Sequence, residues 1–355
     1  MRALLGAAVA AALLSVAVGS ADAATRTVHL RGTAYEFNKV EKLLPGATIR
    51  VAEDSRLHAT VGADGTYDLA VPARATITPY IVAAGYHTIY LQTFRTAGAD
   101  LANVNFQTPS TAVYQALVAL LAVPVDAAGD PSACAIVSTF STRNVRDRDY
   151  PGFIAYGAHG VAGATASATP ALPPPIYFNA AVLPDPAQVL SSRDGGVVWT
   201  GVPAGVYTIR GQHPTSRFAS FVATCRPGRV VNANPPWGLH ELGLANRAVI
   251  DATWSRTALR SLTVRRLPKG ATVRVRCTGT PRCATTVRPG GTSVNLRARL
   301  GSAATRLRPG QTLEVTVTAH RYDGTVARWR IGRTGTPRRT SLCLPLGDTA
   351  PRMRC

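Results

Sequence analysis

Gly46-Ala47-Thr48, Asp64-Gly65 and Val71-Pro72-Ala73 return later in the chain, in the same order, as Gly163-Ala164-Thr165, Asp194-Gly195 and Val202-Pro203-Ala204. In each copy the Gly-Ala-Thr precedes an apolar strand, and the Asp-Gly suits a tight turn in which glycine takes a positive φ. The Val-Pro-Ala closes the strand that follows this turn. Such an order is typical of a small β-sandwich used twice, so we predict an all-β chain of tandem β-sandwich domains.

Strand-like segments and turn residues divide the 355 residues into a leader and three units. Residues 1–23 are predicted to be a signal peptide, and residues 24–106 a first β-sandwich. Residues 107–246 are predicted to be a second, diverged sandwich with a Pro-rich insertion and one short N-terminal helix at 112–122. Residues 247–355 are predicted to be an Arg-rich C-terminal β domain, built as an Ig-like or similar sandwich.

The leader has the three parts of a secretory signal peptide. Met1-Arg2 gives a positive start, residues 4–18 are rich in Ala, Leu and Val, and Ala21-Asp22-Ala23 fits a cleavage site. No cysteine directly follows the apolar segment, which disfavours a lipid anchor, and no later segment has the length of a transmembrane helix. We therefore expect a secreted protein of the extracellular space or cell envelope, and the sequence leaves open whether it is released.

Six cysteines follow the leader, and all of them lie beyond the first unit. An even number of cysteines in an exported protein indicates disulfides, for which six cysteines allow 15 connectivities. Proximity and the domain boundaries favour three pairs, and a four-thiolate metal site is disfavoured because no C-x2-C spacing repeats. The predicted pairs are Cys134–Cys225, Cys277–Cys283 and Cys343–Cys355.

The positive charge is concentrated in the C-terminal unit. Residues 247–355 hold 22 of the 39 Lys and Arg residues and only four acids, a net charge of +18, whereas residues 1–246 have a net charge of +2. Arginines that alternate with apolar residues on neighbouring strands would share one polar face and form a cationic stripe. The six residues assigned to this stripe are Arg274, Arg276, Arg297, Arg299, Arg328 and Arg330.

A cationic stripe of arginines is suited to anionic partners. Guanidinium groups bind phosphate or carboxylate through two hydrogen bonds, so the partner could be an anionic cell-wall polymer, an acidic polysaccharide, lipid head groups or extracellular DNA. No pattern indicates sequence-specific nucleic-acid recognition. The competing interpretation is an ordinary solvated strand face without a ligand.

Aromatic and amide residues of the second unit form another candidate site. The residues are Tyr177-Phe178-Asn179, Trp199 and the segment Asn232-Ala233-Asn234-Pro235-Pro236-Trp237. Rings with nearby amides suit sugar stacking, and Trp237 is the member most expected to contact a ligand. Trp199 lies in an apolar strand and suits a core position. Carbohydrate binding by the second unit is therefore an alternative function.

No catalytic pattern stands out in the chain. The seven histidines are scattered without an H-x-H or H-E-x-x-H pair, and neither a G-x-S-x-G elbow nor a nucleotide-binding loop is present. Tyr177, Tyr207 and His213 resemble part of the iron-ligand set of intradiol dioxygenases, but the paired histidines of that family are absent. We expect no catalytic residue, cofactor or metal. An enzyme of unrecognised type in the second unit remains the alternative.

Several motifs of the first unit occur together in a known family. They are Leu30-Arg31-Gly32-Thr33, the segment LPGATIRV at 44–51, DGTYDL at 64–69 and Ala84-Gly85-Tyr86. In this order they resemble the carboxypeptidase regulatory-like domain, a transthyretin-like sandwich of the carbohydrate-binding-like fold group. Leu267-Pro268-Lys269-Gly270 and Cys343-Leu344-Pro345 resemble a C-terminal module of secreted actinobacterial proteins. Neither resemblance implies a catalytic residue, and both imply a non-catalytic binding or spacer module at the cell envelope.

Overall fold

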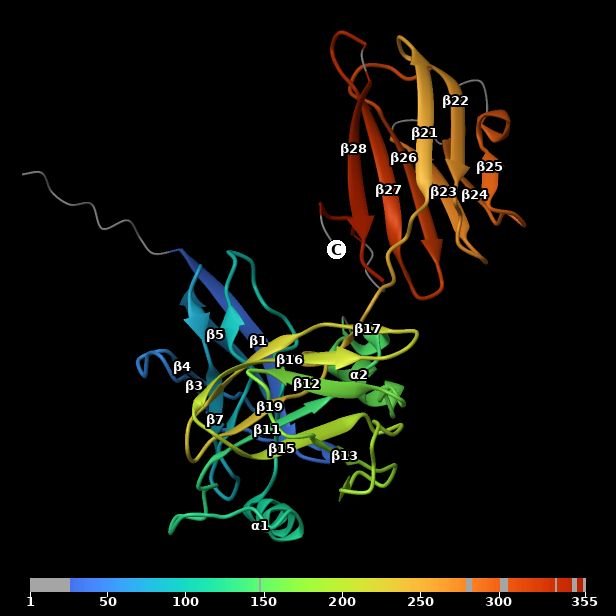
Figure 1. Cartoon of the computed structure of the whole chain (residues 1–355). Coiled ribbons are helices and arrows are strands. Elements are labelled where there is room, and N and C mark those ends of the chain that lie inside the picture. Colours follow the sequence, from blue (N-terminus) through green and yellow to red (C-terminus); the bar gives the residue numbers. More distant parts are fainter. Residues whose placement is uncertain are drawn as a thin grey trace, which may run out of the picture.

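The computed structural model describes residues 26–146, 148–278, 283–300, 306–335, 337–346 and 350–353. The predicted signal peptide lies outside these residues. Strands are the main secondary structure of the described chain and form sheets that pack against each other (Figure 1), so the all-β prediction is confirmed. Among the helices of the described chain, none is long and apolar enough to cross a membrane.

The first unit begins with a four-stranded sheet in the order β10-β1-β2, with β5 also paired to β1. A separate pair of short strands, β6 and β9, lies beside it. These strands are β1 (Thr27–Glu36), β2 (Lys39–Leu43), β5 (Thr66–Pro72), β6 (Thr76–Ile77), β9 (Phe94–Arg95) and β10 (Phe106–Thr108).

A nine-stranded sheet runs from the first unit into the second, in the order β14-β13-β15-β11-β19-β8-β7-β3-β4. The two units meet where β8 and β19 pair in parallel, at Tyr90 and Val231. Its strands are β3 (Thr48–Val51), β4 (His58–Thr60), β7 (Pro79–Val82), β8 (Ile89–Tyr90), β11 (Cys134–Thr139), β13 (Ile176–Phe178), β14 (Pro184–Asp185), β15 (Gly196–Val202) and β19 (Val230–Ala233).

The second unit is completed by a five-stranded sheet in the order β12-β16-β17-β20, with β18 also paired to β16, on the same edge as β17. This sheet packs on the β11–β15 face through a core that includes Ile136, Trp199 and Ile209. Its strands are β12 (Thr165–Thr169), β16 (Gly205–Gln212), β17 (Arg217–Phe218), β18 (Phe221–Cys225) and β20 (Glu241–Leu242).

The two sequence repeats fold in the same way. Strand β1 pairs with β5 antiparallel and with β10 parallel, and β11 pairs with β15 and β19 in the same two senses. Gly46 donates its N–H to Val61 at 2.9 Å, and Gly163 donates to Ser191 at 2.8 Å. The predicted common topology of the repeats is therefore confirmed for these strands.

The Asp-Gly turns of the two repeats are also equivalent. Asp64 and Asp194 each accept a hydrogen bond from the backbone N–H two residues further on, at 3.0 Å. The glycines that follow, Gly65 and Gly195, have φ values of +75° and +82°. A Cβ at Gly195 would lie 2.5 Å from the carbonyl oxygen of Phe140, so both conformation and space require glycine there.

The proposed limit of the first unit, between residues 106 and 107, passes through β10. This strand pairs with β1 through Thr108, so the first unit's sheet continues past the limit. The segment that separates the repeats is instead 109–133, which lies between β10 and β11. The limit drawn from the sequence cuts this strand because β10 joins the sheet by parallel pairing with β1, which is far from it in the sequence. Such a pairing leaves no local signal in the sequence.

Two α-helices lie in the connections. Helix α1 (Thr111–Leu120) is the predicted helix, and the Ser110 hydroxyl accepts the Val113 N–H at its start. Helix α2 (Tyr150–Tyr156) was not predicted, because its seven residues are too short to show helical periodicity. Its start at Asp149 and its end at Gly157, with φ +70°, are nevertheless ordinary capping signals.

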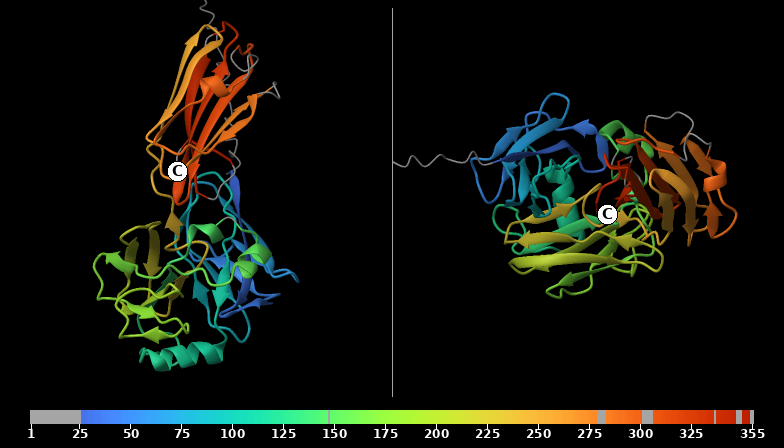
Figure 2. Two further views of the ribbon diagram at one scale, coloured as in Figure 1. Left: turned by 90° about the vertical axis from the view of Figure 1, so that its right-hand side faces the viewer. Right: turned by 90° about the horizontal axis from the view of Figure 1, so that it is seen from above.

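The C-terminal unit is a two-sheet sandwich that stands apart from the joined first two units (Figure 2). One sheet has the order β21-β22-β25 and the other β24-β23-β26-β27-β28, with a core of aliphatic residues and Trp329 between them. Its strands are β21 (Val249–Ser255), β22 (Ala258–Arg265), β23 (Thr272–Cys277), β24 (Thr285–Val287), β25 (Ser293–Asn295), β26 (Thr312–Ala319), β27 (Tyr322–Ile331) and β28 (Pro337–Leu344).

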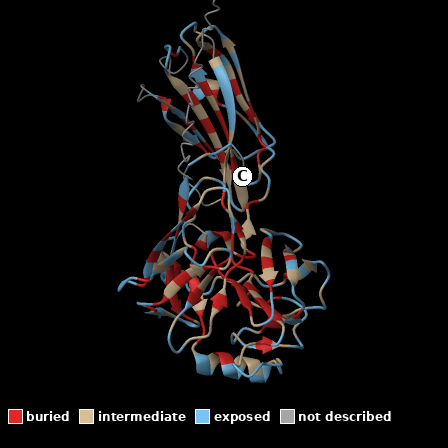
Figure 3. Ribbon diagram, turned by 90° about the vertical axis from the view of Figure 1, so that its left-hand side faces the viewer, coloured by how far each residue is buried: buried red, intermediate tan, exposed pale blue. Residues whose placement is uncertain are grey.

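Burial alternates along several of the C-terminal strands, such as β23 and β26 (Figure 3). In β23, Val273 and Val275 are buried while Arg274 and Arg276 are exposed. The predicted period of two is therefore present on this strand, and it directs its arginines away from the core. The unit contacts the rest of the chain through backbone hydrogen bonds between Leu244 and the 321–323 segment, at 2.7 and 2.9 Å.

Candidate functional site

The outer face of the five-stranded C-terminal sheet carries five arginines on neighbouring strands. Arg276 lies opposite Glu314, which lies opposite Arg328, and Arg330 lies opposite Arg338. Side chains at alternate positions of paired strands share one face, so these residues point outward together. We call this set the arginine face, and its members are Arg274, Arg276, Arg328, Arg330 and Arg338.

Glu314 is the one acid within the arginine face. Its Oε2 accepts hydrogen bonds from Arg328 at 2.8 and 2.6 Å. This ion pair neutralises one guanidinium, so the four exposed members, Arg274, Arg276, Arg330 and Arg338, supply the available charge. The face is hollowed between β23 and β26 into a cavity of about 180 Å³, which Arg274 and Arg276 help to line.

Arg297 and Arg299 do not belong to this face, so the predicted six-residue stripe is wrong in these two positions. They lie in the 3-10 helix η3 (Arg297–Arg299), which follows β25 in the other sheet. The Asn295 side chain caps this turn by accepting the Arg297 N–H at 3.0 Å. Leu296 and Leu300 are buried while Ala298 between them is exposed, a pattern that fits a helical turn rather than a strand.

Trp237 is packed at the contact between the first two units. Its ring meets the edge of Phe94 at 5.1 Å between centroids, and its indole N–H donates to the Ala102 carbonyl at 3.2 Å. The Arg146 guanidinium lies over the ring, 3.8 Å from its centroid. Ligand contact by Trp237 stays a prediction, but the structure already assigns it an indole hydrogen bond and a cation on one ring face.

The other aromatic residues of the predicted sugar site separate into two groups. Tyr177 and Trp199 belong to the core of the second unit. Phe178 and Asn232, by contrast, line a cavity on the opposite face of the nine-stranded sheet. These residues are neighbours in the sequence but lie on two faces of the sheet, because successive residues of a strand point to opposite faces.

The residues considered as iron ligands are engaged in local structure. The Tyr177 hydroxyl accepts the Ala166 N–H at 2.9 Å, and the Tyr207 hydroxyl donates to the Pro203 carbonyl at 3.1 Å. His213 Nδ1 accepts backbone N–H groups two and three residues further on, both at 3.1 Å. Within the described ranges, no three His, Cys, Asp or Glu side chains are placed to share a metal ion.

Two of the predicted disulfides are present. Cys134 and Cys225 connect β11 to β18 over a sequence separation of 91, and Cys277 and Cys283 close a separation of 6. Cys343 is also disulfide-bonded, but its predicted partner Cys355 lies outside the described residues. That third pairing stays a prediction.

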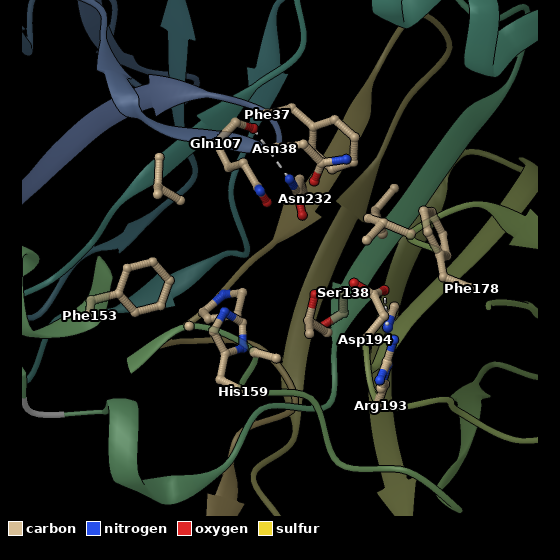
Figure 4. A pocket seen from close by; sticks show the side chains of 18 of the residues that line it. Phe37, Asn38, Gln107, Ser138, Phe153, His159, Phe178, Arg193, Asp194 and Asn232 are labelled. Carbon is tan, nitrogen blue, oxygen red and sulfur yellow. Dashed lines mark hydrogen bonds between the residues drawn. The ribbon is translucent and has the colours of Figure 1, made fainter. Parts of the chain in front are cut away.

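A cavity that the sequence did not indicate lies between the first two units. It has a volume of about 440 Å³ and is bounded by the β1–β2 turn, the outer face of β11, β13, β15 and β19, and helix α2 (Figure 4). Its residues are distributed from Tyr35 to Pro235, so no local sequence motif contains them. One lining residue, Asp194, belongs to the Asp-Gly turn of the second repeat, and the sequence identified it only as a turn residue.

No known protein family matches the chain, and no curated protein matches it. Among solved structures, the Streptococcal ancillary pilin is 10% identical over 89% of this chain and 95% of that chain, with a TM-score of 0.21. The Bacillus anthracis TIE protein is 10% identical over 93% of this chain, with a TM-score of 0.19, and a type II cohesin-X-dockerin complex from Acetivibrio cellulolyticus is 16% identical over 23%, with a TM-score of 0.20. The chain spans 50% and 58% of the last two. These low identities and TM-scores assign no family, so function has to be argued from the chain's own surfaces.

Proposed function

We propose that this chain is a non-catalytic exported binding module, and that its arginine face binds an anionic polymer at the cell envelope. The observation that carries the proposal is the common outward direction of Arg274 and Arg276 on β23 and of Arg330 on β27, two strands of one sheet that are separated only by β26. A polymer with regularly spaced negative groups can contact several of them at once, whereas small ions cannot.

The charge of the unit supports the same function. A net charge of +18 in residues 247–355 attracts polyanions from a distance, and attraction of this kind weakens as salt is added. Extended pairing along β23, β26 and β27 fixes the backbone from which these arginines project, so no backbone segment has to be ordered on binding. Disulfides in the described chain favour an oxidising, extracytoplasmic location.

Binding of the full chain to heparin, with neutral dextran as the control polymer, tests the proposal. The double variant Arg274→Ser/Arg276→Ser removes two members of the arginine face. Basic residues at an anionic surface contribute roughly 1 kcal/mol each, so the dissociation constant should rise about tenfold or more. The matched control is Arg299→Ser/Arg306→Ser, which removes the same charge from exposed residues beside the other sheet.

The expected result is salt-sensitive heparin binding that the control variant largely retains and the Arg274/Arg276 variant largely loses. Equal loss in both variants would show that net charge alone, without a defined face, attracts the polymer. Unchanged affinity in both variants would show that these arginines form an ordinary solvated strand face without a ligand. Circular dichroism should show the same fold in all three proteins, because exposed charges contribute less than about 1 kcal/mol to stability.

A further inference from the structure

The cavity between the first two units has the size and construction of a small-molecule site. Its volume of about 440 Å³ falls within the range of roughly 300–1,000 Å³ that is typical of ligand pockets. Both repeats build it: Phe37 comes from the β1–β2 turn, Ser138 and Phe178 come from strands of the second unit, and Phe153 comes from α2. Helix α2 is fixed over the first unit by its own small core, which includes Tyr35, Phe153 and Val145.

Aromatic rings and amides share the lining of this cavity. Phe37, Phe153 and Phe178 supply the rings, and Gln107 and Asn232 supply side-chain amides. The Asn232 amide donates to the backbone carbonyl of Gln107 at 3.3 Å. Figure 4 shows these two amides gathered on one side and Phe153 and His159 on another. Rings offer a flat apolar contact, and amides offer both donors and acceptors to hydroxyl groups.

Burial shifts the pKa values of two titratable side chains that line the cavity. Burial raises the pKa of the Asp194 carboxyl, although the Gly196 N–H bound at 3.0 Å acts in the opposite direction. Burial lowers the pKa of His159, which favours its neutral imidazole. The Nδ1 of His159 is buried and has no hydrogen-bond partner among the described residues.

The charges of the lining residues indicate which kind of ligand the cavity can bind. The lining contains one carboxyl, Asp194, and one guanidinium, Arg193, beside the neutral His159. A cavity without net charge does not favour an ion over a neutral molecule, and its several polar groups disfavour a purely apolar one. A ligand with many hydroxyls and an apolar ring face satisfies both the polar atoms and the phenyl rings.

We propose that this cavity is a binding site for a neutral sugar. The amides of Gln107 and Asn232, with Asp194 and His159, hold the hydroxyl groups, and the phenyl rings contact the C–H face of the sugar ring. The site lies in the first two units and carries no net charge, so it is independent of the arginine face. Two residues that the sequence indicated for sugar contact, Phe178 and Asn232, line this cavity, whereas Trp199 does not.

Saturation-transfer NMR and calorimetry with the full chain test the site, using glucose, galactose, mannose and N-acetylglucosamine as probes. Ala158→Trp places a large ring at an exposed position of the lining and should abolish saturable binding. Ala155→Trp is the matched control, because Ala155 is exposed on α2 but does not line the cavity. Asp194→Asn keeps an oxygen for the Gly196 N–H and removes the charge, so it should weaken binding about tenfold.

The proposal requires saturable binding of at least one probe that is insensitive to salt, lost in Ala158→Trp and retained in Ala155→Trp. Absence of saturable binding by all four sugars would overturn it. Binding that survives in Ala158→Trp would also overturn it, since the sugar would then occupy another place. Neither result affects the heparin experiment, whose ligand and variants lie in the C-terminal unit.

Discussion

Replacing Glu36 by glutamine should destabilise the first unit in a pH-dependent manner. The Glu36 side chain is only 1% exposed at the end of β1, and its oxygens bind the ammonium groups of Lys39 at 2.8 Å and Lys42 at 2.5 Å. The Tyr86 hydroxyl donates to it at 2.8 Å. The hydrogen bond from Lys39, followed by that from Lys42, lowers the pKa of Glu36 from 4.5 to about 2, against the opposing effect of burial.

The size of the effect follows from this pKa. The difference between 4.5 and about 2 corresponds to about 3 kcal/mol of interaction favouring the carboxylate. Both lysine side chains are more than half exposed, so water screens part of this interaction, and we expect about 2 kcal/mol. Because the folded-state pKa is the lower one, the contribution is complete above about pH 4.5 and is lost as the pH falls toward 2.

Urea titrations of the parent and Glu36→Gln, followed by circular dichroism, measure the difference in unfolding free energy. We expect about 2 kcal/mol near pH 7 and a difference of less than about 1 kcal/mol at about pH 2.5. The control is Glu41→Gln, which removes the same charge from an exposed position of β2. A difference that does not change with pH, or one equal to that of Glu41→Gln, would refute the assignment of the stability to these ion pairs.

Three further predictions concern the turns, the cavity and the tail. Gly46→Ala should lower the free energy of unfolding by about 1 kcal/mol, for its positive φ alone. Gly195→Ala should lower it by about 3 kcal/mol or more, because the added Cβ meets a backbone oxygen at 2.5 Å. Equal losses of stability in thermal unfolding would contradict this. Asp194→Asn should make the fold more stable near neutral pH, since the raised folded-state pKa means that ionisation of this carboxyl opposes folding, and the gain should vanish at low pH; a loss of stability at neutral pH would contradict it. Non-reducing peptide mapping should find Cys343 joined to Cys355, and a bridge to any other cysteine would show that prediction to be wrong.

Local signals in the sequence predicted the repeat well. The Asp-Gly turns and the cap at Ser110 each depend on residues a few positions apart, so their conformations could be inferred directly from the chain. The alternation in β23 was informative for the same reason. At Arg297 the local pattern was ambiguous, because Val294, Leu296, Ala298 and Leu300 alternate as in a strand, while Leu296 and Leu300 alone also suit a turn of helix.

Features that depend on distant residues could not be predicted. The pairing of Tyr90 with Val231 joins two units through one parallel contact, and nothing near either residue indicates the other. The cavity is a product of that junction and of α2, so its lining is spread over both repeats. The arginine face gained Arg338 only because β28 pairs with β27, a neighbour relation that the sequence did not specify.

The Cys134–Cys225 bridge has a consequence for the durability of the protein outside the cell. Between these cysteines lies the loop from β14 to β15, in which Val189 is 77% exposed and Leu190 42%. An extracellular protease that prefers aliphatic residues can reach this loop, but the two pieces it produces remain covalently joined and still share the second unit's core. Cleavage there would yield a nicked molecule that keeps its C-terminal unit attached, and the cut would become visible in electrophoresis only after reduction.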